Sequence, residues 1–232
     1  MKALLYKEFK LAMHPICYIF IALFPLMILI PSYPTAVGFI YVLSCYPILF
    51  LGANKGQQSN DLLFSTLLPV RKKDIVFARI ITVLFMQFAF MAIMSLLYPL
   101  AYMLFGNGIV DDETGEVLQF GVGFGLKSFV LTLAIAIVGF ALADLIFFPI
   151  YYKKGKSIVA STLLTILGFM IYLGVFTIAL PYIMDYIAGY EMHDSIALWI
   201  QFIALGASLL ISALIHYLTY RVSSKLLERV DF

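Results

Sequence analysis

The sequence predicts an all-α membrane protein that crosses the bilayer with six transmembrane helices. Hydrophobic residues make up 63% of the chain and charged residues only 12%. The charges leave uncharged runs at 11–54, 80–110, 157–184 and 195–220. Roughly 20 apolar residues in a helix cross a hydrocarbon core of about 30 Å, so each run can hold at least one span. Because the runs are continuous rather than alternating, they favour helices over the strands of a barrel.

The predicted spans belong to a single domain that covers residues 1–232. In chain order they lie at about 16–30, 35–53, 80–105, 126–152, 158–184 and 196–220. The short connection "PSYPT" joins the first two, and its prolines favour a tight helical hairpin. We expect the first span to be retained, because "PSYPTA" is a poor cleavage site for a signal peptide.

The basic residues orient these spans. Fourteen of the fifteen lysines and arginines fall on one side of the predicted bilayer, and only Lys127 falls on the other. The connections on the side of Lys127 carry acidic clusters instead, at 111–116 and 185–194. An excess of basic residues marks the cytoplasmic side. The pattern therefore predicts a multi-pass protein of the plasma membrane with both termini in the cytoplasm.

The first residues, "MKALLYKEFK", predict an amphipathic helix at the membrane interface. Charged residues (Lys2, Lys7, Glu8, Lys10) alternate with apolar ones (Leu4, Leu5, Phe9, Leu11). In such a helix the lysines reach anionic headgroups while the apolar face enters the interface. The alternative interpretation is a simple positive flank of the first span.

The segment 60–79, "NDLLFSTLLPVRKKDIVFAR", is the part of the largest cytoplasmic connection that carries most of its charge. That connection uses about twenty-five residues where about five would suffice, and long connections in compact folds are commonly functional. "DLLFSTLLP" predicts a short apolar helix that starts near Ser59, Asn60 or Asp61 and ends before Pro69. This helix lies either along the bilayer and neighbouring helices or in a groove on another protein.

The same segment resembles the cytoplasmic loop of ABC-2-type transporter permeases, the membrane subunits of ABC exporters of Gram-positive bacteria. The matching features are Asp61, the apolar turn, Leu68-Pro69-Val70, a basic cluster and Arg79 at the entry to the next span. The N-terminal "MKALLYKEFK" also looks like the interfacial helix of that family. One departure is Arg71, where the family often has Ser or Thr. Arg71 cannot form a capping box with Asp74, which leaves the start of the second short helix open.

The resemblance implies a permease that binds no cofactor itself, with ATP and Mg held by a separate ABC ATPase. Two ATPase copies would pair with two permease chains, as a homodimer or with a different second permease, in a bacterial membrane. The segment 60–79 would contact the ATPase and carry its motion to the spans. The residues implied in this coupling are Asn60, Asp61, Leu62, Leu63, Phe64, Leu67, Leu68, Pro69, Arg71, Lys72, Lys73, Asp74 and Arg79. The cargo would be an amphipathic peptide, an antimicrobial or a lipid-like molecule moved outward.

Asp144 is the only acidic residue within a predicted span, and Gln87 lies at a similar depth in another. An ionisable group at membrane depth suggests a functional site. Asp144 and Gln87 therefore line a translocation path, or Asp144 makes an interhelical contact to Gln87 or to His216. Small residues at helical spacing (Gly139 and Ala143; Ala204, Ser208 and Ser212) predict close helix packing.

Other functions receive less support. "KKGKS" at 153–157 ends like a phosphate-binding loop but has Ile150 where the pattern needs glycine, so we expect no nucleotide site. Three scattered histidines and a lone intramembrane carboxylate predict neither a catalytic nor a metal site. Nothing in the pattern indicates a nucleic-acid partner. A secondary transporter, or an assembly or sensor subunit without transport, stays open as an alternative.

Overall fold

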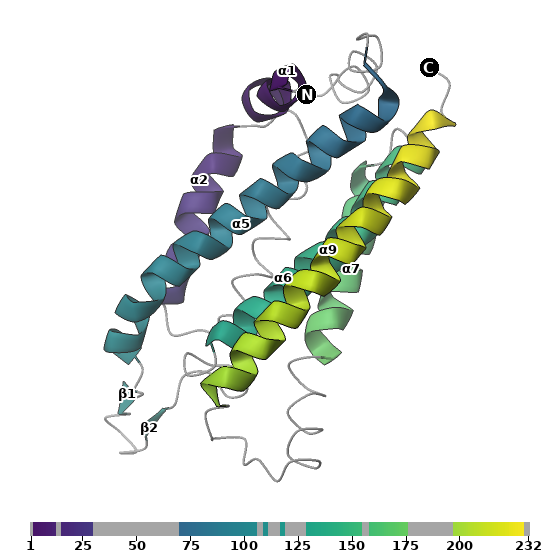
Figure 1. Cartoon of the computed structure of the whole chain (residues 1–232). Coiled ribbons are helices and arrows are strands. Elements are labelled where there is room, and N and C mark those ends of the chain that lie inside the picture. Colours follow the sequence, from purple (N-terminus) through teal and green to yellow (C-terminus); the bar gives the residue numbers. More distant parts are fainter. Residues whose placement is uncertain are drawn as a thin grey trace.

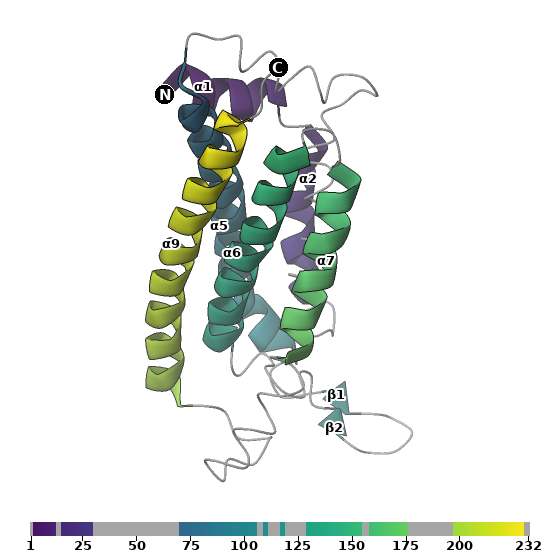
Figure 2. The same ribbon diagram turned by 90° about the vertical axis from the view of Figure 1, so that its right-hand side faces the viewer.

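The computed structural model describes residues 2–12, 15–29, 70–105, 109–110, 117–118, 129–154, 158–175 and 197–229. The long helices run side by side as a bundle, and α1 lies across one end of it (Figures 1 and 2). Nearly every described residue is helical, as the sequence predicts. The helices are α1 (Lys2–Lys7), the π-helix η1 (Glu8–Ala12), α2 (Pro15–Leu23), the 3-10 helix η2 (Phe24–Leu29), α5 (Lys72–Phe105), α6 (Phe129–Lys154), α7 (Ile158–Gly174) and α9 (Leu198–Glu228).

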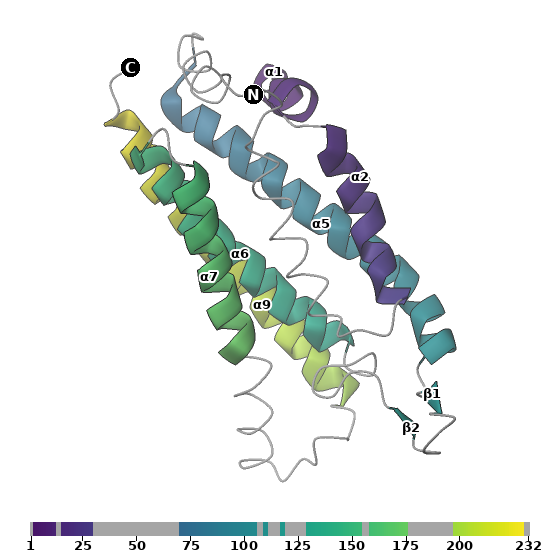
Figure 3. The same cartoon turned by 180° about the vertical axis from the view of Figure 1, so that it is seen from behind.

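The direction of the helices agrees with the predicted order of crossings. From α5 through α6 and α7 to α9, successive helices alternate in direction, so that α1 and the last turn of α9 lie at the same end (Figure 1). α2 lies beside α5 and runs in the same direction (Figure 3). That arrangement is the one a span at 35–53 would require, although this predicted span lies outside the described residues.

Three of the described helices are long and apolar enough to cross a membrane, at Lys72–Leu104, Phe129–Lys153 and Leu198–Glu228. Two shorter apolar helices cover Cys17–Leu29 and Val159–Gly174. Together, these five helices fall on the predicted first, third, fourth, fifth and sixth spans. The count of six crossings and the orientation of the termini stay predictions.

α6 is the central helix of the bundle. It lies between α7 and α9 (Figure 2), and aromatic side chains on it are buried, among them Phe140, Phe147 and Tyr152. α9 turns Ser208 and Ser212 inward, while several of its leucines are exposed, namely Leu198, Leu209, Leu210, Leu214 and Leu218. Gly139 of α6 faces α7, where a Cβ atom would come within 2.8 Å of a ring carbon of Phe169. The small residues therefore permit the close packing that their spacing predicts, and the structure shows this packing within one chain, which the spacing alone left open.

The structure differs from the prediction at several boundaries. α9 continues past Tyr220 to Glu228, and α5 starts at Lys72, eight residues before the predicted span, because the second short helix expected there runs directly into the span, as predicted. Both extensions carry charged residues. These charges end the apolar run in the sequence, but they do not end the helix. The structure also contains a two-residue antiparallel ribbon, β1 (Ile109–Val110) with β2 (Val117–Leu118). Strands this short leave no recognisable period in a sequence.

Candidate functional site

Arg71, the residue before α5, forms a side-chain ion pair with Asp74 in place of a capping box. The Asp74 amide donates a hydrogen bond of 2.8 Å to the Arg71 carbonyl, which starts the helix. The Arg71 side chain reaches the Asp74 carboxylate through Nε at 3.0 Å and Nη2 at 3.3 Å. This hydrogen bond raises the pKa of Arg71 above its usual value. An acidic residue in the first turn also suits the positive end of the helix dipole. The arginine that departs from the family pattern therefore still marks the start of this helix.

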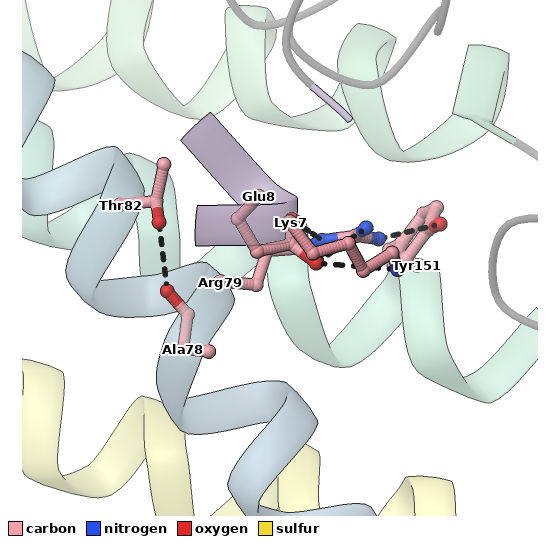
Figure 4. A network of polar contacts seen from close by, with 6 residues as sticks. All are labelled: Lys7, Glu8, Ala78, Arg79, Thr82 and Tyr151. Atoms are coloured by element: carbon pink, nitrogen blue, oxygen red, sulfur yellow. Dashed lines mark hydrogen bonds and ion pairs between the residues drawn. The ribbon is translucent and has the colours of Figure 1, made fainter. Parts of the chain in front are cut away.

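Two turns further along α5, Arg79 forms a buried ion pair with Glu8 of η1 (Figure 4). Arg79 Nε lies 3.0 Å from Glu8 Oε2, and Nη2 lies 3.2 Å from Oε1. The exposed fractions of the two residues are only 5% and 3%. Two parallel N–H···O bonds between guanidinium and carboxylate fix orientation as well as distance. The pair therefore sets how the N-terminal segment sits on α5.

The ion pair extends to a third helix. Arg79 Nη1 donates a hydrogen bond of 3.3 Å to the hydroxyl of Tyr151, near the C-terminal end of α6. Lys7 Nζ lies 3.6 Å from Glu8 Oε1 on the other side. The buried guanidinium of Arg79, on α5, thus contacts side chains of both η1 and α6. Figure 4 shows Lys7, Glu8, Arg79 and Tyr151 close together.

Local structure explains why Glu8 points inward. The regular helix α1 ends at Lys7, and the wider π-helix η1 begins at Glu8 itself. Such turns are uncommon and often occur at functional sites, because they redirect side chains. Next to Glu8, the Phe9 ring meets Phe85 of α5 edge-on, at 5.4 Å between centroids. The Tyr18 hydroxyl of α2 donates a hydrogen bond to the Phe9 carbonyl.

This arrangement confirms that the N-terminal segment is helical, but one lysine lies elsewhere than predicted. Lys2 and Lys10 are exposed, as a helix whose lysines reach headgroups requires. Lys7 is instead buried beside Glu8. The alternation in the sequence predicted Lys7 on the exposed face with the other lysines. That prediction assumed a regular helical period, and the π-turn that follows Lys7 departs from this period.

A second polar network lies at the middle of the bundle and joins three helices. Asp144 of α6 is fully buried, and its Oδ2 accepts a hydrogen bond of 3.1 Å from Gln87 Nε2 of α5. The same oxygen lies 3.0 Å from Nε2 of His216 on α9. Asp144 therefore makes both of the interhelical contacts that its position in the sequence suggested, to Gln87 and to His216.

Hydrogen-bond chemistry constrains the proton content of this network. His216 Nδ1 lies 2.7 Å from the Ser212 carbonyl, which only accepts, so Nδ1 carries a proton. The contact between Nε2 and Asp144 needs a further proton, on either the imidazole or the carboxyl group. With that proton the pair is neutral as a whole. Neutrality suits an apolar interior, where an uncompensated charge is costly.

The described residues bring together only part of the predicted site. Arg71, Lys72, Lys73, Asp74 and Arg79 stand on or next to the first two turns of α5. The remaining predicted coupling residues, from Asn60 to Pro69, lie outside the described residues. Sequence reasoning missed the roles of Glu8 and Tyr151. The available signal was that Glu8 is the only acidic residue in a basic N-terminal segment. Within the described ranges, no three His, Cys, Asp or Glu side chains gather as a metal site would need.

Comparison with known proteins adds one finding. A family model described as ABC-2 family transporter protein matches residues 3–227, nearly the whole chain. No curated protein and no solved structure gives a match. The family match includes both the N-terminal helix with Glu8 and the segment that leads into α5.

Proposed function

Because the chain belongs to the ABC-2 family of transporter proteins, whose members are membrane permease subunits of ABC transporters, we propose that it serves an exporter and receives its driving force at residues 60–79. A separate ABC ATPase docks there and hydrolyses ATP. The observation that carries this proposal is the continuity of α5, which runs without a break from Lys72 to Phe105.

The continuity of α5 has a mechanical consequence. A helix of 34 residues is a rod about 50 Å long. Its first two turns carry the basic cluster that follows Pro69, and the rest is apolar enough to span a membrane. A force applied to the segment before Lys72 would therefore tilt or shift the whole span. A flexible connection at this point would absorb the same movement.

The finer parts of the proposal follow from the family and the composition. Two ATPase copies serve two permease chains in the plasma membrane of a bacterium, and the cargo is an amphipathic peptide, an antimicrobial or a lipid-like molecule that leaves the cytoplasm. Large apolar side chains cover the outward face of α9, which suits contact with lipid or with a second permease chain.

Docking is tested at the apolar turn before Pro69. The double variant Leu63→Asp/Leu67→Asp should lose the ATPase, because two carboxylates in an apolar groove have no partners there. The chain is purified by a tag from its own membrane, and ATP hydrolysis by the purified sample is measured. The control Leu63→Met/Leu67→Met keeps the apolar surface and should retain the ATPase.

Three outcomes contradict the proposal. An aspartate variant that inserts at normal yield and still copurifies with full ATPase activity would place docking elsewhere. A wild-type chain that carries no ATP-hydrolysing partner would favour a secondary transporter instead. A partner that hydrolyses ATP without moving any cargo would favour an assembly or sensor subunit.

A further inference from the structure

The buried ion pair between Glu8 and Arg79 links the N-terminal helix (α1 and η1, residues 2–12) to the start of α5. Buried ion pairs add little net stability, since removal of both charges from water offsets most of their attraction. Their best-attested use is to fix one arrangement among several. We propose that Glu8 is a positioning residue, which with Arg79 makes the N-terminal helix move together with α5 when the ATPase acts. This inference rests on the proposed function.

The geometry of the pair supports transmission of movement. Arg79 stands seven residues into α5, about 10 Å along its axis from Lys72. A guanidinium bound through two nitrogens tolerates neither rotation of α5 nor sliding past η1, because either movement breaks at least one of the two bonds. The ring contact between Phe9 and Phe85, further along the helix, is a second point of attachment.

The direction of transmission follows from the fold. α1 lies across the end of the bundle, whereas α5 runs along it (Figures 1 and 2). A shift of α5 is therefore passed to a helix that is oriented differently. Through Tyr151 the same guanidinium also contacts α6, the central helix. Arg79 is thus placed to pass one movement to two further elements.

The test uses the permease with its bound ATPase in lipid nanodiscs, and the variants Glu8→Gln, Arg79→Met and the double variant Glu8→Gln/Arg79→Met. Hydrogen–deuterium exchange is measured over residues 2–12 and 72–80, with and without a non-hydrolysable ATP analogue. Glu228→Gln serves as a matched control, because Glu228 is an exposed carboxylate at the same end of the bundle.

Without nucleotide, exchange over 2–12 should rise by about tenfold or more in each single variant and in the double variant, and should not change in Glu228→Gln. With the ATP analogue, the wild type should change its exchange over both 72–80 and 2–12. The double variant should respond over 72–80 alone. It removes both charges of the Glu8–Arg79 pair together, so its thermal midpoint should lie closer to that of the wild type than those of the single variants.

The outcomes separate a positioning role from a structural one. Unchanged exchange over 2–12 in all variants overturns the inference, and so does an equal nucleotide response there in the wild type and the double variant. A nucleotide response over 72–80 but not over 2–12 in the wild type also overturns it, while the proposed function stands. If the analogue changes exchange in neither segment, both the transmission and the docking of an ATPase before α5 are wrong.

Discussion

At the scale of single residues, the two buried carboxylates Glu8 and Asp144 differ in the side chains that they contact. Glu8 meets an arginine, which stays charged, so its pair is ionic. Asp144 meets the neutral amide of Gln87 and the imidazole of His216, so its network holds a shared proton. Both carboxylates connect different helices, but only the first lies next to the proposed docking segment.

A double-mutant cycle measures the contact between Asp144 and His216. Asp144→Ala should cost about 3–5 kcal/mol of unfolding free energy, because it leaves buried polar groups without their partner. Asp144→Asn should cost less, about 1–3 kcal/mol, because the amide still bonds to the imidazole. The unfolding free energy of the purified protein in mixed micelles is the measurement.

The cycle combines Asp144→Ala with His216→Ala. The two effects should be non-additive by about 1–3 kcal/mol, as for residues in direct contact. Additive effects would show that the side chains do not interact, and the three-helix network at the middle of the bundle would then be wrong.

At the scale of elements, the packing of α6 on α7 depends on one missing side chain. The Cβ atom of an alanine at Gly139 would lie 2.8 Å from ring carbons of both Phe169 and Tyr172. The Tyr172 ring cannot turn away freely, because its hydroxyl donates a hydrogen bond of 2.8 Å to the Ile135 carbonyl. Space at this position is therefore set by two rings at once.

Gly139→Ala should consequently destabilise the protein by about 1–3 kcal/mol, the usual cost of overpacking. Gly206→Ala is the matched control, since no atom lies within 4 Å of its added Cβ. The control should be neutral or slightly stabilising, because alanine favours a helix by about 1 kcal/mol over glycine. The measurement is the thermal midpoint of each variant in detergent, which should fall for Gly139→Ala and stay level or rise for Gly206→Ala. Equal midpoints for both variants would contradict the described contact of α6 with α7.

At the scale of the whole molecule, the helix directions and the positive-inside rule agree on one topology. α1 and the end of α9 share one end of the bundle, and the β1–β2 ribbon lies at the other (Figure 1). The sequence predicts fourteen of fifteen basic residues on the side of the two termini, so that end is predicted to face the cytoplasm.

Cysteine labelling tests this topology. In a Cys17→Ala/Cys45→Ala background, a cysteine at Val117 should react with a membrane-impermeant maleimide in intact cells. A cysteine at Glu228 should react only after the membrane is permeabilised. Labelling of Glu228→Cys in intact cells would reverse the orientation and place the segment 60–79 outside the cell, away from any ATPase.

The sequence by itself determined the class of the protein, the position of its described helices and its family. Those properties depend on apolar runs and on a local motif, both of which are contiguous in the chain. It also marked Arg79, Asp144 and Gln87 as notable residues. The tertiary structure alone decided their partners, because Glu8 and Arg79 are 71 positions apart, and Asp144 and His216 are 72 apart. Which polar side chains meet depends on how each helix is rotated against the next, and at Glu8 on a π-turn that departs from the regular helical period.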